Sequence, residues 1–192
     1  MADSNTRHGW ALVLAYVLCI YLSLPFMRPL LARLYALLGP AALSLAVNGV
    51  LGLCAALLLL AGLRRGPGTA AALLLLLAAV GWAASRIEVP EERFHFLEYG
   101  LLGLLVHRAG SRDTSFLLLL LLTILAGAVD EAIQYLLPDR VGELRDVALN
   151  SGGGLAGLCV GHLLRRPRQS ISPGPGGRRP PGPWWRRRGH RR

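Results

Sequence analysis

Several features that commonly reveal a function are missing from the chain. It has no lysine, so all 21 basic side chains are arginine. Its three cysteines, Cys19, Cys54 and Cys159, lie within apolar runs and form no CxxC motif, which argues against a disulfide framework or a zinc site. No serine elbow, phosphate-binding glycine loop or HExxH motif is present. The sequence therefore lacks the common motifs of hydrolases, nucleotide-binding proteins and zinc proteases.

Charge is scarce over long stretches of the 192 residues. The chain is 53% hydrophobic and its mean hydropathy is +0.45, which is too apolar for a soluble domain of this size. The net charge of +10 arises at one end. Residues 165–192 hold 10 arginines and no acid, whereas residues 1–164 hold 11 arginines and 11 acids. The body of the chain is therefore neutral and mostly hydrocarbon.

Apolar runs of this length predict helices that cross a membrane. A span of about 30 Å needs about 20 helical residues, and an open strand edge would leave backbone groups unsatisfied in lipid. We therefore predict an all-α, polytopic transmembrane helix bundle of about six spans. The predicted spans are residues 9–27, 41–63, 69–84, 91–107, 116–137 and 145–164. Residues 28–40 carry leucines at helical spacing, which predicts either an amphipathic helix in the interface or an extension of the flanking spans.

The basic tail, residues 165–192, consists mainly of Arg, Pro, Gly and Ser and contains Trp184 and Trp185. This composition predicts disorder. Beside a membrane span, we expect the tail to bind anionic lipid headgroups of the bilayer, and nucleic acid is the less favoured partner. The positive-inside rule then predicts a multi-pass protein of the plasma (inner) membrane with both termini in the cytoplasm.

Two polar clusters interrupt the apolar sequence in its second half. Three spans are predicted in residues 1–85 and three more in residues 86–164. The fourth span begins, the fifth ends and the sixth begins on the same side, so the clusters are expected to meet at one membrane face. Ionisable groups in spans are costly and usually mark function. The candidate binding residues are Glu91, His95, Glu98, Tyr99, Asp130, Glu131, Gln134, Arg140, Arg145, Asp146 and Asn150.

Three interpretations of these residues remain open. They form a polar plug that locks three helices, a metal site, or a pocket that binds a polar or phosphate-bearing group or performs acid–base work. A single histidine disfavours the metal site, so no metal or cofactor is predicted. In the pocket, Glu98 and Glu131 would be the buried carboxylates and His95 their partner. Other partners are Arg93 and the proposed anion contacts Arg140 and Arg145.

Glycines at helical spacing follow the second polar cluster. Gly153, Gly157 and Gly161 form two overlapping GxxxG steps, which let helices approach closely. The sixth span is therefore expected to pack tightly against the fourth and fifth.

The order and spacing of these motifs resemble the VanZ-like family of small bacterial membrane proteins. The matching segments are Glu91-x-x-x-His95-Phe96-x-x-Tyr99-x-x-x-Gly103, Asp130-Glu131-x-x-Gln134, Pro138-x-Arg140 and Arg145-Asp146-x-x-x-Asn150-x-x-Gly153-x-x-x-Gly157. They cover about residues 86–164, the predicted VanZ-like domain. One departure is Glu91-Glu92, where members of the family often have Asp-Lys.

What the resemblance implies is a role in the cell envelope. The founding member is associated with teicoplanin resistance, and no settled enzymatic activity comes with the family. We therefore expect a non-enzymatic protein that binds a lipid-linked or glycopeptide-like ligand. The alternatives are a membrane-embedded enzyme acting on a lipid head group and a proton-coupled carrier that uses Glu98 and Asp130.

Overall fold

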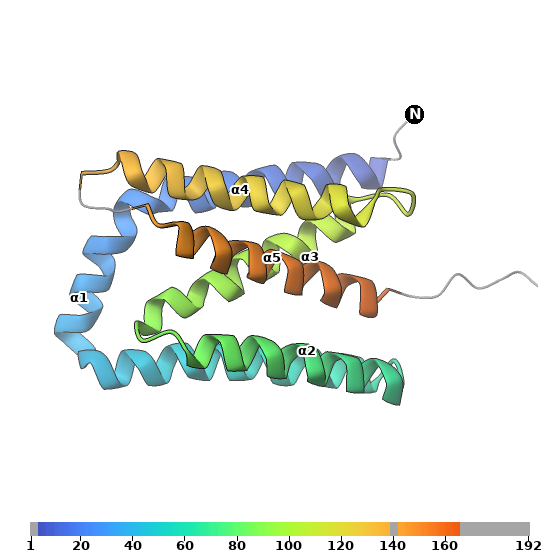
Figure 1. The fold of residues 1–192 in the computed structure, drawn as a ribbon, viewed down its shortest axis with the longest axis horizontal. Helices are drawn as coiled ribbons and strands as arrows, with labels where there is room; N and C mark the ends of the chain where they lie inside the picture. Colours follow the sequence, from blue (N-terminus) through green and yellow to red (C-terminus); the bar gives the residue numbers. More distant parts are fainter. Residues whose placement is uncertain (1–3, 139–141, 166–192) are drawn as a thin grey trace, which may run out of the picture.

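The computed structural model describes residues 4–138 and 142–165 (Figure 1). Over these ranges the chain forms five α-helices and one short 3-10 helix, and it contains no β-strand. The all-α class predicted from the apolar runs is confirmed. Arg140 and the tail from residue 166 onward lie outside the described residues, so the predicted disorder of the tail stays a prediction.

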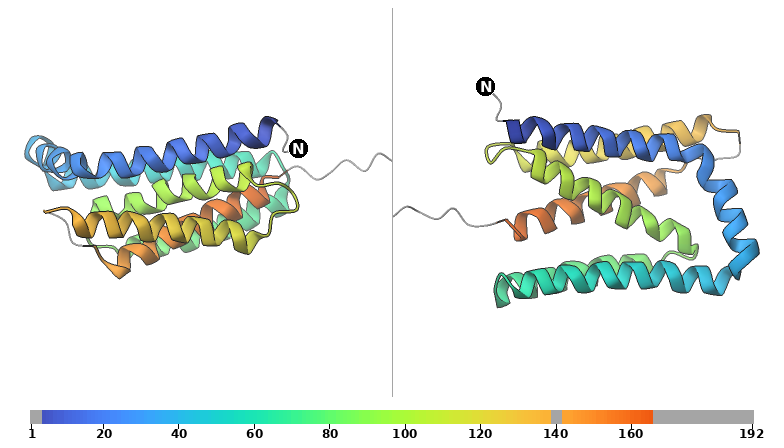
Figure 2. Two further views of the ribbon diagram at one scale, coloured as in Figure 1. Left: turned by 90° about the horizontal axis from the view of Figure 1, so that it is seen from above. Right: turned by 180° about the vertical axis from the view of Figure 1, so that it is seen from behind.

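The first helix, α1 (Ser4–Leu63), changes direction twice (Figures 1 and 2). Pro25 and Pro29 lie near the first change, where each proline removes a backbone hydrogen bond. Gly39 causes the second, because its φ of 77° and ψ of 162° are not helical. We call residues 4–24 the outgoing leg, residues 25–39 the elbow and residues 40–63 the return leg. The segment predicted as an amphipathic helix makes up most of the elbow.

The remaining helices follow the predicted runs closely. They are α2 (Pro67–Ser85), the 3-10 helix η1 (Pro90–Arg93), α3 (Phe94–Ala109), α4 (Phe116–Leu136) and α5 (Leu144–Leu163). The turn before α2 contains Gly66 at φ 124°, followed by a proline at the first helical position, where its missing N–H costs nothing. The fourth predicted run starts later than expected, because Pro90–Arg93 forms the separate turn η1.

Three of these helices are long and apolar enough to cross a membrane by length and composition. They cover Thr6–Leu63, Pro67–Ser85 and Phe116–Leu136. Helix α3 has only 16 residues, and α5 is diluted by glycines and by the polar residues of its first turns. The structure thus supports a membrane protein, and the count of six spans remains a prediction.

Helices α3 and α5 cross with their backbones in contact. A Cβ atom added to Gly157 of α5 would overlap the carbonyl oxygen of Gly100, and one added to Gly103 would overlap that of Gly154. A Cβ at Gly153 would lie 2.9 Å from the carbonyl oxygen of His95. Only glycine permits so close a crossing. This crossing brings the first turns of α3 and α5 together with the end of α4.

The apolar core lies between the outgoing leg, α3, α4 and α5. Its buried members include Val13, Leu102, Leu119 and Leu158. The outgoing leg is also attached by hydrogen bonds, because the Tyr21 hydroxyl donates to the carbonyl oxygen of Ala126 at 2.8 Å. This packing places the outgoing leg against the helices that carry the polar clusters.

Candidate functional site

The two polar clusters meet at one end of the bundle. The elbow, η1, the end of α4 and the start of α5 lie together there, opposite the end that holds the N-terminus (Figures 1 and 2). Hydrogen bonds between the clusters fix their relative position. The Tyr99 hydroxyl donates to Oδ2 of Asp130 at 3.0 Å, and both side chains are almost fully buried. The structure therefore brings the two clusters together at one end of the bundle, and their position at a membrane face stays a prediction.

Glu131 accepts three hydrogen bonds within the site. Its Oε1 accepts hydrogen bonds from Nε2 of Gln134 at 3.1 Å and from Nδ2 of Asn150 at 3.4 Å. Its Oε2 accepts a third from the backbone N–H of Glu143, the residue just before α5, at 3.2 Å. A carboxylate that accepts several donors can remain buried. Glu131 therefore joins the end of α4 to the start of α5.

A cavity of about 760 Å³ opens between these helices and α1. One wall is apolar and comes mainly from both legs and the elbow of α1. The opposite wall is polar and comes from η1, α3, α4 and α5. The polar side chains of that wall are Glu91, Glu92, His95, Glu98, Asp130, Gln134, Glu143 and Asp146. The cavity is therefore amphipathic, with carboxyl groups facing hydrocarbon.

Six of the predicted site residues line this cavity. They are Glu91, His95, Glu98, Asp130, Gln134 and Asp146. Three others, Tyr99, Glu131 and Asn150, are buried outside its lining. The structure thus divides these nine residues into six that line the cavity and three that are buried between the helices.

Arg145, predicted to contact an anion, is 50% exposed and does not line the cavity. Its guanidinium lies 2.9 Å from Oε2 of Glu92. The pKa of the Glu92 carboxyl is raised, because its burial outweighs the attraction of Arg145. Arg145 therefore forms an ion pair with a carboxylate of the protein itself.

Arg93 was expected to pair with the deeper carboxylates and instead binds α1 and the loop before η1. Its Nη1 donates to Oδ1 of Asn48 at 2.9 Å, and its Nη2 donates to the carbonyl oxygen of Ile87 at 2.8 Å. Arg93 precedes Glu98 by five positions, or about 140° around a helix, so the two side chains do not share a face. Arg93 thus anchors η1 to the return leg.

A hydrogen bond to η1 holds the elbow over the cavity. The Tyr35 hydroxyl donates to Oε2 of Glu91 at 2.5 Å. The side chains of Met27, Leu30, Leu31 and Leu34 line the cavity below it. The leucine stripe of the elbow therefore forms a cover for the polar wall.

His95 has an unused polar atom in this setting. Its Nδ1 is buried and has no hydrogen-bond partner among the described residues. The predicted contacts of His95 with Glu98 and Glu131 are not among the hydrogen bonds of the described residues. A ligand in the cavity could therefore hydrogen-bond to His95. In the described ranges, no three His, Cys, Asp or Glu side chains are grouped so that they could hold a metal ion.

The sequence analysis missed three charged residues of the cavity: Arg28, Glu92 and Glu143. Glu92 and Glu143 belong to the same polar stretches as the predicted residues, so membership of the cluster was the available signal. Arg28 begins the leucine stripe, which marks the elbow as a segment with one apolar face. Nothing in the sequence alone indicated that this face covers the polar clusters.

Comparison with known proteins gives one match. The family model described as VanZ/LLP1 matches residues 11–165, which extends well beyond the motif-bearing segment 86–164. Neither a curated protein nor a solved structure shows significant similarity to the chain.

Proposed function

The chain belongs to the VanZ/LLP1 family, and from this premise we propose that it is a cell-envelope membrane protein that binds an amphipathic ligand in the cavity beneath the elbow. The observation that carries the proposal is the division of this cavity into a hydrocarbon wall and a carboxyl-rich wall. Ligand sites usually combine apolar lining with a few convergent polar groups, and volumes of about 300–1,000 Å³ are typical. The cavity of about 760 Å³ lies in this range.

The polar end of the ligand is a cation or a strong hydrogen-bond donor. Six carboxyl groups line the cavity, and Arg28 is the single arginine among the described residues that line it. An anion would meet this carboxyl-rich wall, because Arg145 pairs with Glu92 instead. The anionic group considered in the sequence analysis also depended on Arg140, which lies outside the described residues. A primary amine or ammonium group complements carboxylates best.

The proposal is binding, and turnover is not required. A covalent mechanism needs an activated nucleophile. The two hydroxyls of the outgoing leg that line the cavity are already engaged with backbone oxygens. Ser23 donates to the carbonyl oxygen of Ile20 at 2.7 Å, and Tyr16 donates to that of Glu98 at 3.1 Å. Both hydroxyl protons are thus directed at backbone oxygens.

We further propose six membrane crossings in the plasma membrane, made by the two legs of α1 and by α2, α3, α4 and α5. An even number of crossings puts both termini on one side. By the positive-inside rule, the 10 arginines of residues 165–192 favour the cytoplasm for that side, where the tail would bind anionic headgroups. The cavity then faces the outer surface.

Topology is tested by labelling single cysteines in intact cells and in opened membranes, in a background without the native cysteines. A cysteine at Asp139 should react with an impermeant maleimide from outside, because this position falls between α4 and α5 in the sequence. A cysteine at Ser172 in the tail should react only after the membrane is opened. Labelling of both positions from the same side would contradict the six-span arrangement.

Ligand binding is tested with hexylammonium and hexyl sulfate, two water-soluble probes with the same chain and opposite charge. Isothermal titration of the purified full chain should detect hexylammonium binding and much weaker binding of hexyl sulfate. The variant Glu98→Gln replaces one carboxyl group of the cavity wall by an amide with little change in shape. We expect it to weaken hexylammonium binding roughly tenfold or more, the range of a charge-assisted hydrogen bond.

The matched control is Glu88→Gln, which makes the same chemical change at an exposed residue outside the cavity lining. It should bind hexylammonium like the wild type. Equal affinity for the two probes, or equal loss in both variants, would overturn the proposed cationic ligand.

A further inference from the structure

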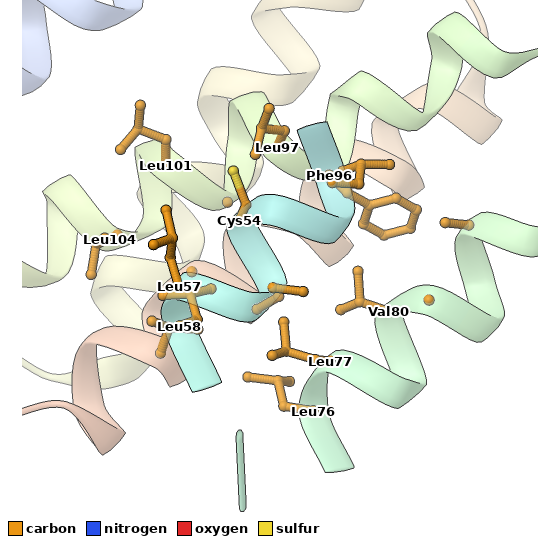
Figure 3. Close-up of a pocket in the computed structure, with 18 of the residues that line it drawn as sticks. Cys54, Leu57, Leu58, Leu76, Leu77, Val80, Phe96, Leu97, Leu101 and Leu104 are labelled. Carbon is orange, nitrogen blue, oxygen red and sulfur yellow. The ribbon is translucent and has the colours of Figure 1, made fainter. Parts of the chain in front are cut away.

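A second hollow of about 630 Å³ adjoins α3 and is lined almost entirely by hydrocarbon (Figure 3). The return leg of α1, α2, α3 and α5 all contribute to it. Its lining contains no side-chain nitrogen or oxygen, and the sulfur of Cys54 is the only atom other than carbon among the side chains drawn in Figure 3. Water would find no hydrogen-bond partner on these side chains, so the hollow requires an apolar occupant or stays empty.

The two hollows share a wall. Leu97 and Leu101 of α3 line both of them, and Glu98, between these leucines in sequence, lines the polar cavity. Leu101 is 44% exposed, so its side chain is not locked in a packed core. A ligand that lies across α3 at these leucines would place one end among carboxyl groups and the other in hydrocarbon.

The walls of the apolar hollow also leave room that helix packing does not use. A Cβ atom added to Gly52 on the return leg, or to Gly81 on α2, would meet no atom within 4 Å. Both glycines line the hollow. A void between packed helices forfeits dispersion contacts along its whole lining. In a bilayer, lipid hydrocarbon is the apolar material that surrounds the protein and can restore those contacts.

We infer that the apolar hollow holds the acyl chain of a membrane lipid whose amine-bearing head group occupies the polar cavity. This inference deepens the proposed function and rests on it for the position of the head group. The ligand class is therefore an aminolipid, with its chain between the return leg, α2, α3 and α5. The elbow covers the head group, and Leu97 and Leu101 lie where head and chain join.

The test is native mass spectrometry of the full chain, extracted from membranes in a mild detergent. We expect about one retained lipid per wild-type chain, and tandem fragmentation should identify an amine in its head group. The variant Gly52→Leu fills the hollow and should reduce lipid occupancy at least tenfold. Its matched control is Gly49→Leu, three residues earlier on the same leg. Gly49 also has no atom within 4 Å of an added Cβ, and it lines neither hollow.

A second pair of variants keeps the test valid if Gly52→Leu does not fold. Gly81→Leu fills the same hollow from α2, and Gly68→Leu is its control on that helix, where the added Cβ again meets no atom within 4 Å. Lipid should be lost from Gly81→Leu and retained by Gly68→Leu, while melting temperatures stay close to that of the wild type.

The outcomes separate the two proposals. Equal lipid retention by the wild type and by Gly52→Leu and Gly81→Leu, or no retained lipid in the wild type, would overturn the acyl-chain site. Hexylammonium binding that depends on Glu98 would still stand in that case. A retained lipid without an amine that is lost on filling the hollow would support the acyl-chain site and overturn the cationic head group.

Discussion

Replacing Gly157 with alanine is expected to lower the melting temperature of the purified protein by roughly 6–12 °C. The added methyl group would overlap the carbonyl oxygen of Gly100, and a backbone atom cannot rotate away as a side chain can. Overpacking of a rigid contact costs about 3 kcal/mol at the upper end of its usual range. For a chain of this size, each 1 kcal/mol corresponds to about 2–4 °C. A thermal scan in detergent, followed by size-exclusion chromatography, measures the change.

Gly49→Ala is the control for this prediction, because no atom lies within 4 Å of a Cβ added there. Alanine is the better helix former, so this variant should melt at or slightly above the wild-type temperature. If both variants behave alike, the backbone contact between α3 and α5 is not a determinant of stability. The comparison thus tests the helix crossing that brings the polar clusters together.

Replacing Glu131 with alanine is expected to destabilise the protein by about 3 kcal/mol or more. The change removes the acceptor of Nδ2 of Asn150 and of the backbone N–H of Glu143. Each buried unsatisfied donor costs about 1–3 kcal/mol. The end of α4 and the start of α5 should separate as a consequence. Hydrogen exchange of residues 131–150, compared between wild type and variant, locates the effect.

The isosteric variant Glu131→Gln distinguishes this structural role from a ligand-binding role. Glutamine keeps one acceptor oxygen for Gln134 and Asn150, but its NH₂ group faces the N–H of Glu143. We expect a partial loss of stability, smaller than that of Glu131→Ala, with hexylammonium affinity unchanged in the folded fraction. Glu88→Gln, at an exposed site, should stay within about 0.5 kcal/mol of the wild type. A loss of ligand affinity at full stability would instead place Glu131 in the binding site.

The helices could be predicted because local chemistry determines them. The fifth predicted run, 116–137, differs from α4 by one residue at its end, since Pro138 cannot continue a helix. The start of α2 was predictable from Gly66 and Pro67 in the same way. The course of α1 was less clear, because its prolines and Gly39 indicate bends without giving their direction.

Side-chain direction within the polar clusters could not be predicted. Glu98 and Glu131 were both expected to be buried carboxylates of a pocket. Glu98 lines the cavity, but Glu131 faces Asn150 and the N–H of Glu143. This difference depends on the register of α5 against α4. That register is set by the glycine contacts that pack α5 against α3. Sequence spacing within one helix contains no information on that register.

The apolar hollow could not be predicted from the sequence either. Leucines and alanines at helical spacing in residues 40–63 and 67–85 are what any membrane helix requires. Whether such side chains meet lipid, each other or a hollow depends on how far apart the helices stand. The open space around Gly52 and Gly81 appears only when the return leg and α2 are placed beside α3.

The contacts of Glu131 have a consequence for the order in which the protein is made. During synthesis, α4 is complete before Glu143 and Asn150 have been added to the chain. An unpaired acid at the centre of a helix raises the free energy of its insertion by about 2.5–3.5 kcal/mol, and Glu131, five residues before the last residue of α4, should carry a smaller part of this cost. Asp130 can find Tyr99, which is already present, but Glu131 has only Gln134 of its own helix. We therefore expect α4 and α5 to insert together as one hairpin, in which the start of α5 supplies hydrogen-bond donors to Glu131.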